Sequence, residues 1–379
     1  MLRGMFVYPW DLQDEGTAEV AARLTGTGLN AVSLATAYHA GKFLRPHAPR
    51  GRVYFPEDGT VYFRPDPSRY GRLQPQAARM VRDHDALAGL ARHAPGLQVT
   101  AWTVGLHNSR LGAAHPDLAC QTPFGDVLVN ALCPSQPEVR RYLTALCLDT
   151  AAQPGVREVA IETPGFQTFR HGHHHEFELL DLPPAAETLL GICFCPACLT
   201  RAREAGLDGQ ALAAEARRAL DAFLADGGAP LPDPRHDPDW AAMQDLRAET
   251  VTSLVREIRE ALPRGTGLSI IPSVQTPNSL CWREGSDLAA LARAADRLEV
   301  TAYQRGAEAI AADIAEVRAT AGPEASLGVI LRPTWPHVTG AEELAACVAA
   351  ARAAGADRIS FYNYGHMRLQ SLDWVARAL

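Results

Sequence analysis

Residues 156–166 read VREVAIETPGF, and this stretch decides the fold that the sequence predicts. A short apolar run, Val159-Ala160-Ile161, stops at Glu162 and is followed by a Thr-Pro-Gly turn. A carboxylate at the end of a buried strand, next to a turn, is where α/β enzymes place their chemistry. The stretch therefore predicts a strand of a parallel sheet with a functional acid at its end.

The same alternation of a short apolar strand and an amphipathic helix recurs along the whole chain. Further strands are predicted by apolar runs that end in turn residues. They span residues 4–8, 29–36, 98–104, 267–272, 298–303, 327–331 and 358–362. Eight alternations in 379 residues predict an α/β fold, a single (β/α)8 TIM barrel domain over residues 1–379, with a doubly wound sheet as the runner-up.

Two segments interrupt this alternation. Residues 40–75 form an excursion after the second strand, in which GRVYFPEDGTVYFRPD (51–66) places two apolar-aromatic runs around Asp58-Gly59. That pattern indicates a β-hairpin, and we expect it to cover part of the barrel mouth. Residues 163–240, after the fourth strand, hold a cysteine-rich loop and helices, and are interpreted as an insertion within the same domain.

Composition and charge narrow the function class. The net charge is -7, so the chain lacks the basic face that nucleic acid requires. No run of 18 apolar residues or export signal is evident, so no membrane partner is expected. The 8 cysteines then indicate reduced thiols or metal ligands and a cytoplasmic protein. A homo-oligomer is compatible with these features.

Polar and aromatic side chains follow the predicted strands. In a barrel, the residues just past each strand face one rim, where active sites are built. Tyrosines, tryptophans, amides and histidines with few cations suit a neutral carbohydrate, although aromatic residues at these positions also plug barrel mouths. The predicted substrate-binding residues at these strand ends are Tyr38, His39, His107, Asn108, Tyr303, Trp335 and Asn363.

A histidine-rich run, RHGHHHEFE, spans residues 170–178. Adjacent side chains in an extended loop point in alternate directions, so at most two of these histidines share one target. We interpret His173 and His174 as substrate contacts. A polar loop without function and a catalytic metal site are the alternatives.

Three cysteines lie within six residues, as Cys193-x-Cys195-x-x-Cys198. This spacing is typical of a tetrahedral zinc site, and four thiolates would make the zinc structural because no coordination position stays open. Cys133, which precedes the helix leading into the fourth strand, is the preferred fourth ligand. Its rivals are Cys120, Cys147 and the nearby histidines, and the competing interpretations are a buried thiol cluster or a redox pair.

Residues 97–205 resemble family 42 of the glycoside hydrolases, the β-galactosidases. The resemblance rests on HPDLACQTPFGDVLVNALCPSQPEVRRYL (115–143), on the strand that ends in Glu162, and on CFCPACLTRAREAG (193–206). It implies a glycosidase-like TIM barrel, an acid/base role for Glu162, and zinc held by Cys133, Cys193, Cys195 and Cys198. The family's nucleophile is a glutamate after strand seven, whereas GVILRPTWPH (328–337) has no carboxylate there, so the retaining mechanism is not implied.

Glycoside hydrolysis normally needs two carboxyl groups. Glu162 is the predicted general acid, because an apolar approach desolvates it and raises its pKa. Asp11, Glu176 and Glu284 are candidates for the second group, and an inverting separation of about 6.5–9.5 Å would accommodate a loop residue. Each could instead cap a helix or form a salt bridge.

Two other functions compete with a glycosidase. The first is a metal-dependent barrel hydrolase that uses the rim histidines, although YPWD replaces the expected HxH pair after the first strand. The second is a carbohydrate-binding barrel without catalysis.

Overall fold

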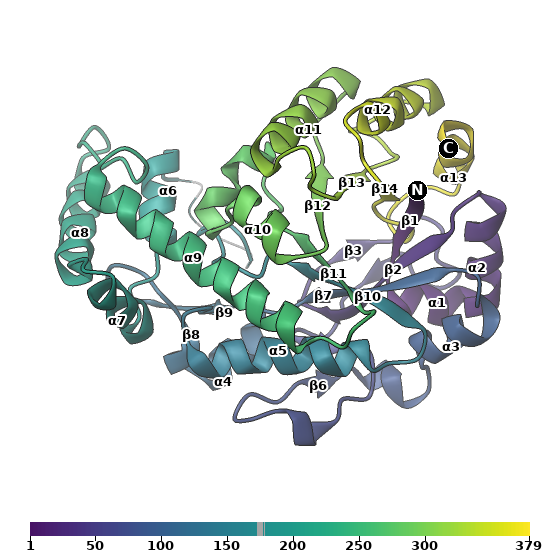
Figure 1. Cartoon of the computed structure of the whole chain (residues 1–379), viewed down its shortest axis with the longest axis horizontal. Helices are drawn as coiled ribbons and strands as arrows, with labels where there is room; N and C mark the ends of the chain where they lie inside the picture. Colours follow the sequence, from purple (N-terminus) through teal and green to yellow (C-terminus); the bar gives the residue numbers. More distant parts are fainter. Residues whose placement is uncertain (173–176, 178) are drawn as a thin grey trace.

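The structure of the chain is a computed structural model that describes residues 1–172, 177 and 179–379. Eight parallel strands form a closed barrel, which β1 completes by pairing with both β14 and β2 (Figure 1). In spatial order, the barrel strands are β1 (Leu2–Val7), β14 (Arg358–Phe361), β13 (Leu327–Leu331), β12 (Arg297–Ala302), β11 (Gly267–Ile271), β10 (Val156–Glu162), β7 (Gln98–Val104) and β2 (Ala31–Tyr38).

Helices connect successive strands and cover the outside of the barrel, as Figure 1 shows. The covering helices are α2 (Thr17–Gly26), α3 (Ala86–His93), α5 (Pro137–Ala151), α9 (Pro238–Ala261), α10 (Leu288–Ala294), α11 (Ala307–Ala321), α12 (Ala341–Ala353) and α13 (Gln370–Ala378). Apolar side chains on the outer face of the strands, such as Val159 and Ile161, pack in the same core as Leu143 and Leu146 of α5. The (β/α)8 barrel is therefore confirmed, and the doubly wound sheet is wrong because the sheet closes.

The excursion after β2 contains a hairpin, but its pairing differs from the prediction. β3 (Phe43–Leu44) pairs antiparallel with β4 (Val53–Tyr54), whereas β5 (Thr60–Val61) pairs with β2 and with β6 (Gln76–Ala77). The two runs around Asp58-Gly59 thus join different sheets. The predicted pairing was wrong because β5 pairs with Ala37 and Tyr38, the end of β2 that extends beyond its pairing with β1.

The insertion after β10 builds a second hydrophobic cluster, the insertion core, beside the barrel. It is formed by α6 (Pro184–Gly191), α7 (Pro196–Glu204), α8 (Gly209–Ala225) and the start of α9, which extend to the left of the barrel in Figure 1. The insertion core consists of Leu182, Ala186, Leu189, Ile192, Phe194, Ala202, Leu212, Ala213, Ala216, Leu220, Phe223, Trp240 and Met243.

In the described part of the chain, no single helix is long and apolar enough to cross a bilayer. By length and composition only, α6 and α7 qualify as a pair, with an angle of 95° between them.

A buried ionic network forms the floor of the barrel. The Arg358 guanidinium pairs with Glu158 at 3.0 Å and with Glu299 at 3.0 Å, and donates to Ser33 at 2.8 Å. Arg358 is fully buried. Gly4 leaves room for Ser360 beside it, since a Cβ at Gly4 would lie 2.8 Å from Ser360 Oγ. The network therefore ties β2, β10, β12 and β14 together around one guanidinium.

Replacing Arg358 by Met should lower the free energy of unfolding by about 3–5 kcal/mol, because Glu158 and Glu299 would be left as buried charges without this partner. Urea unfolding monitored by circular dichroism measures the loss. The exposed Arg368→Met is the matched control and should change stability by less than about 0.5 kcal/mol. Adding Glu299→Gln to Arg358→Met should restore part of the stability. A cost below 1 kcal/mol for Arg358→Met alone would show that the network does not hold the barrel.

Candidate functional site

Side chains of β10 alternate between the inside and the outside of the barrel. Glu158, Ala160 and Glu162 therefore point inward, because strand side chains repeat with a period of two. Glu158 joins the floor network, and Glu162 lies one layer higher, at the carboxyl end of the strand. This end is the face where TIM barrels carry their active sites.

A cavity of about 190 Å³ opens above the floor at this end of the barrel. Residues from seven barrel strands or the positions just after them contribute to it. The cavity is lined by Phe6, Tyr38, His39, Glu162, His171, Ile271, Val274, Thr301, Tyr303, Ile330, Arg332 and Tyr362. Among the described residues of this lining, Glu162 is the one carboxylate, and Phe6, Tyr38, Tyr303 and Tyr362 give the cavity aromatic walls.

The Glu162 carboxyl is held by one strong hydrogen bond. Trp102 in β7 donates its indole Nε1–H to Glu162 Oε2 at 2.6 Å. Burial raises the pKa of Glu162 to about 7, and the Trp102 hydrogen bond opposes that rise. Glu162 therefore retains its proton at a pH where an exposed glutamate has lost it.

Tyrosine hydroxyls form a second polar group in the barrel mouth. Tyr8 Oη lies 3.0 Å from Tyr38 Oη and 3.0 Å from Tyr362 Oη. Burial raises the pKa of Tyr38 and of Tyr362, and the charge of Glu162 adds to both shifts. The hydroxyls thus stay protonated and offer donors and acceptors to a ligand beside Glu162.

Three histidine rings gather at the edge of the cavity. The His39 and His107 rings stack at 4.1 Å between centroids, and the His171 ring lies 5.2 Å from His107. Burial lowers the pKa of His39 to about 4 and also lowers the pKa of His171. His39 and His171 are therefore neutral imidazoles at pH 7, suited to hydrogen bonding with uncharged hydroxyl groups.

Of the residues predicted to bind substrate, some line the cavity and others form contacts elsewhere in the protein. The structure brings together Tyr38, His39, Glu162 and Tyr303 in the lining, with His107 stacked behind His39. Asn108 instead caps α4 (Ser109–Ala114) by accepting from Leu111 N at 2.9 Å. Glu176, His173 and His174 lie outside the described residues.

Asp11, Asn363 and Trp335 take other positions around the mouth. Asp11 is buried at the start of α1 (Pro9–Glu15), where it pairs with Arg45 at 3.2 Å and accepts from Tyr8 N at 3.2 Å. Asn363 is buried and accepts from Gly365 N at 2.9 Å, while Trp335 is 75% exposed. Asp11 and Asn363 thus form contacts that stabilise the fold, and Trp335 is not among the described residues that line the cavity.

Glu284 lies behind the cavity wall rather than in it. It is buried in the 3-10 turn Asn278–Glu284, and burial raises its pKa to about 8, with the charge of Glu162 adding to the shift. Ser273 and the backbone of Val274 hydrogen-bond to the Glu284 carboxyl and oppose the rise. Because Val274 itself lines the cavity, Glu284 is separated from it by about one residue layer.

The sequence interpretation missed Trp102, Arg332 and Tyr362. Trp102 is inside β7 rather than after it, so attention to strand ends overlooked it. Arg332 and Tyr362 are the first residues after β13 and β14. Strand periodicity could have found all three, since each continues the inward-facing series of its strand.

A second cavity of about 180 Å³ adjoins the first and shares His171 with it. Residues of the insertion and of the loops after β10 and β11 line it. They are Thr168, Arg170, His171, Glu187, Thr188, Gly191, Gln275 and Arg283. The two cavities together offer room for a ligand longer than one ring.

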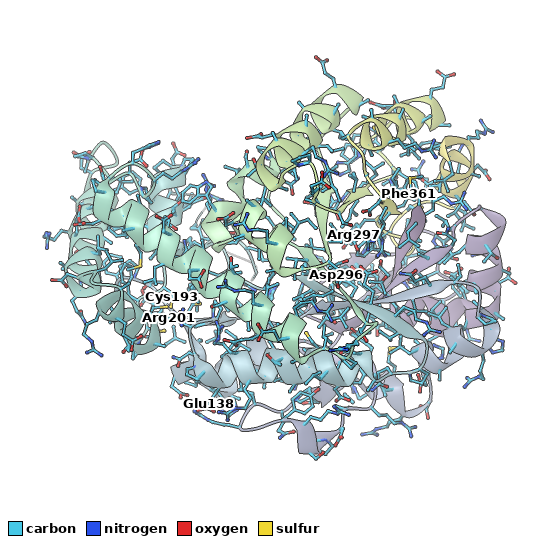
Figure 2. The ribbon with its side chains drawn as sticks, in the orientation of Figure 1. Glu138, Cys193, Arg201, Asp296, Arg297 and Phe361 are labelled. Atoms are coloured by element: carbon cyan, nitrogen blue, oxygen red, sulfur yellow. The ribbon has the colours of Figure 1, made fainter. Side chains whose placement is uncertain are left out.

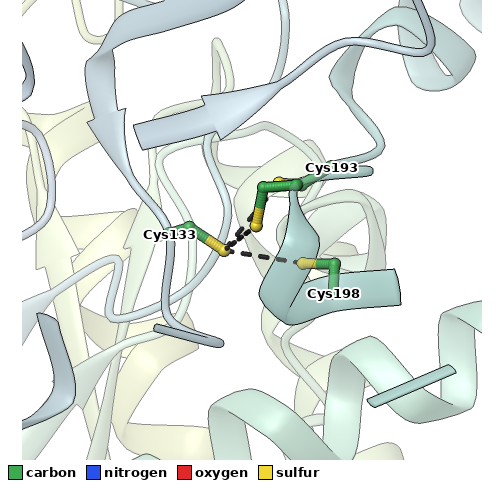
Figure 3. A group of neighbouring side chains, drawn as sticks. Cys133, Cys193 and Cys198 are labelled. Carbon is green, nitrogen blue, oxygen red and sulfur yellow. Dashed lines mark hydrogen bonds between the residues drawn. The ribbon is translucent and has the colours of Figure 1, made fainter. Parts of the chain in front are cut away.

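Four cysteine sulfurs converge between the barrel and the insertion. The Cys133 sulfur lies 3.5 Å from Cys198, 3.6 Å from Cys195 and 3.8 Å from Cys193. Figure 3 shows Cys133 facing Cys193 and Cys198 from the opposite chain segment. All four sulfurs lie within 4.8 Å of one another.

This geometry fits a four-coordinate metal ion. Metal–sulfur bonds of about 2.3 Å place tetrahedral ligands about 3.8 Å apart, close to the observed separations. Cys133 follows the hairpin of β8 (Ala119–Gln121) and β9 (Val127–Leu132), while Cys195 caps α7. Cys120 contacts Cys133 and Cys193 but falls outside the group of four. The choice of Cys133 as the partner of the CxCxxC motif is therefore supported by the geometry.

The surroundings of the thiols also suit a metal site. Arg247 is buried nearby, and it interacts electrostatically with the thiols of Cys133, Cys193 and Cys198. A cation there offsets the negative charge that four thiolates around a divalent ion would carry. Figure 2 shows Cys193 and Arg201 well away from Arg297 in the barrel, so this site is distinct from the floor of the cavity. The four cysteines are the one group of potential ligands close enough to share an ion among the described residues.

Comparisons with known proteins identify the fold. No protein-family model and no curated protein matches the chain. Among solved structures, the glycoside hydrolase domain of PgaB (BpsB) from Bordetella bronchiseptica is 16% identical over 96% of this chain and 94% of that chain, with a TM-score of 0.60.

Two β-galactosidases are similarly close. The enzyme from the psychrophilic Marinomonas ef1 is 13% identical over 99% of this chain and 58% of that chain, and Gan42B, a GH42 β-galactosidase, is 13% identical over 100% and 55%. Both have a TM-score of 0.59. This chain thus spans little more than half of either β-galactosidase. The shared feature is the barrel of these glycoside hydrolases, and the comparisons do not single out family 42.

Replacing Trp102 by Phe removes the indole N–H but keeps an aromatic ring in the barrel. Because that hydrogen bond favours the ionised carboxylate, its loss should raise the pKa of Glu162 above about 7. Carbon-13 NMR of the glutamate carboxyl groups measures the titration, and Glu162→Gln assigns the resonance. Trp240→Phe, which changes a buried tryptophan of the insertion core, should leave the titration unaltered. An unchanged pKa in Trp102→Phe would contradict the assigned hydrogen bond.

Proposed function

We propose that the chain is a glycosidase-type enzyme that cleaves a carbohydrate, with Glu162 as the general acid/base. The observation that carries the proposal is the Glu162 carboxyl, half-buried at the carboxyl end of β10 in an aromatic cavity, with its pKa raised to about 7. A protonated carboxylic acid in such a place can donate to the leaving oxygen of a glycoside. Barrel neighbours that are glycoside hydrolases support the same assignment.

The proposed reaction uses the rest of the lining for binding. Trp102 fixes the Glu162 carboxyl, so its free oxygen can face the scissile bond. Tyr38, Tyr303 and Tyr362 offer aromatic faces to a sugar ring and hydroxyls to its oxygens. The leaving oxygen takes the proton of Glu162 as its bond to the anomeric carbon breaks. The water oxygen then bonds to that carbon while the Glu162 carboxylate accepts the proton of the water, which returns the site to its starting state.

Glycoside hydrolysis normally needs a second carboxyl group, so its position distinguishes a catalytic barrel from one that only binds sugar. Among the lining residues that the structure describes, Glu162 is the one carboxylate, and Glu284 lies behind Val274. We propose Glu284 as its partner, brought to the cavity by movement of the loop after β11. A carbohydrate-binding barrel without catalysis is the alternative, and the shielded position of Glu284 is the observation in its favour.

We further propose that the cysteine cluster holds one structural zinc ion. Zinc takes four thiolates tetrahedrally, and Cys133, Cys193, Cys195 and Cys198 leave no open position for a substrate. The ion would connect the barrel to the insertion core, whose helices line the second cavity. Eight free, buried cysteines also support a reducing compartment, for which we propose the cytoplasm.

Glu162→Gln keeps the size of the side chain but removes the acidic proton. Turnover of a glycoside with a sugar or alkyl leaving group should fall about 10²–10⁴-fold, because that leaving group needs protonation. The leaving group of an aryl glycoside needs less protonation, so turnover of that substrate should fall by a smaller factor. In the wild type, kcat should fall as the pH rises through about 7, since the raised pKa keeps the acid protonated only below that value.

The control for this experiment is Glu187→Gln, which changes a carboxylate of the adjoining cavity that is paired with Arg170. Its kcat for the aryl glycoside and its pH profile should match those of the wild type. Full turnover by Glu162→Gln on a natural oligosaccharide would refute the acid/base role. Sugar binding without cleavage of any glycoside would favour the binding barrel instead.

Cys195→Ser should release the metal and destabilise the segment from Cys193 to α7, because the binding energy of a closed site is part of the folding energy. Elemental analysis should give one zinc per wild-type chain and markedly less for the variant, with a lower melting temperature. Cys347→Ser changes a buried cysteine of α12 away from the cluster and should keep the zinc. A metal-free wild type purified without chelators would overturn the zinc assignment.

A further inference from the structure

We infer that the substrate carries an anionic substituent, a carboxylate or a sulfate on the sugar, and that Arg332 selects it. This inference rests on the proposed function and names its substrate class. It replaces the neutral ligand expected from the sequence, because Arg332, the first residue after β13, places a cation in the cavity.

Arg332 places a positive charge in the same cavity as Glu162. Its guanidinium lies 3.8 Å from the centroid of the Tyr303 ring and 5.5 Å from that of Tyr362. Its Nη1 donates to His337 Nε2 at 3.1 Å, while His337 Nδ1 donates to the Tyr303 carbonyl at 2.8 Å. These contacts orient the guanidinium, and none of them neutralises it.

The charge of Arg332 has no carboxylate partner among the residues that the structure describes. Its Nε is buried and makes no hydrogen bond. Other arginines of the barrel are paired, as Arg358 is with Glu158 and Arg45 with Asp11. A partly buried guanidinium that is held in place without a carboxylate partner is suited to bind an anionic ligand.

Glu162 does not serve as that partner. Both side chains line the same cavity, but Glu162 and Arg332 form no ion pair within 4.0 Å. The hydrogen bond to the Glu162 carboxyl comes from Trp102 instead. A sugar ring between them would present its glycosidic oxygen to Glu162 and its anionic group to Arg332.

The position of Arg332 also fits a role in recognition rather than in proton transfer. Guanidinium groups bind carboxylates and sulfates through two parallel N–H donors. The neighbouring His337 has its pKa lowered by burial and by Arg332, so it remains neutral and does not compete for the anion. Arg332 is accordingly assigned as a specificity-determining residue.

Binding of single sugars tests this assignment without any need for turnover. The probes are D-glucuronate, D-galacturonate and D-galactose 6-sulfate, each compared with D-glucose or D-galactose, with dissociation constants from NMR titrations at pH 6. At least one anionic sugar should bind the wild type about 10- to 100-fold more tightly than its neutral counterpart. Arg332→Gln should bind both alike, and Arg332→Lys should keep part of the preference. The uronates and the sulfate distinguish the two anionic groups.

Arg235→Gln is the matched control, since Arg235 lies over the Trp282 ring at 5.3 Å and is absent from the described lining of the cavity. It should keep the wild-type preference. Equal binding of anionic and neutral sugars by the wild type would overturn the inference, as would an equal loss of both in Arg332→Gln.

The outcome separates this inference from the proposed function. If Glu162→Gln and the wild type both prefer a uronate, but the wild type cleaves no glycoside, the anion site stands and the enzyme assignment fails. If the wild type cleaves neutral glycosides at least as fast as uronate-bearing ones, and Arg332→Gln changes neither rate, the enzyme assignment stands and the anion site fails.

Discussion

The barrel depends on the pairing of the buried Arg358 guanidinium with Glu158 and Glu299. A fully buried charge is stable only when partners surround it, and here the partners come from strands on different sides of the barrel. The floor network thereby fixes the inward face of β10. Glu162 follows on the same face one layer higher, where Trp102 donates a hydrogen bond to its carboxyl and burial raises its pKa. Two glutamates of one strand thus occupy opposite electrostatic environments.

Much of the barrel could be predicted because its strands are short, apolar and regularly spaced. Periodicity is a local property of the sequence, and the burial of each strand on both faces makes that signal strong. The floor network could not be predicted from such patterns. Arg358, Glu158 and Glu299 look like ordinary charged residues until the closed sheet brings them together.

Candidate site residues were predicted unevenly for a similar reason. Glu162, Tyr38 and Tyr303 were found because they follow strands, and they do line the cavity. Asp11 and Asn108 also follow strands, but a helix begins soon after each strand. The Asn108 side chain caps its helix, and the Asp11 side chain accepts from Tyr8 N and pairs with Arg45. Local capping chemistry thus competes with substrate contact at the same rim.

The cysteine cluster and the excursion after β2 show how well short sequence motifs predict the structure. CxCxxC spacing places three thiols close together whatever surrounds them, and the structure brings Cys133 to them. The Asp58-Gly59 turn indicated a hairpin, yet β5 pairs with β2 instead. The turn preference of Asp58-Gly59 is local, and it yields to pairing with the end of β2, which belongs to a different sheet from β4.

The two-residue repeat of β10 constrains how this protein can vary in evolution. Loops around the barrel can gain or lose residues singly, as the large insertion after β10 illustrates. Between Glu158 and Glu162, by contrast, a single inserted or deleted residue would turn one of the two glutamates toward the helices, whichever end stayed in register. Homologues that keep both the floor and the acid should therefore preserve the spacing between these glutamates or change it in pairs.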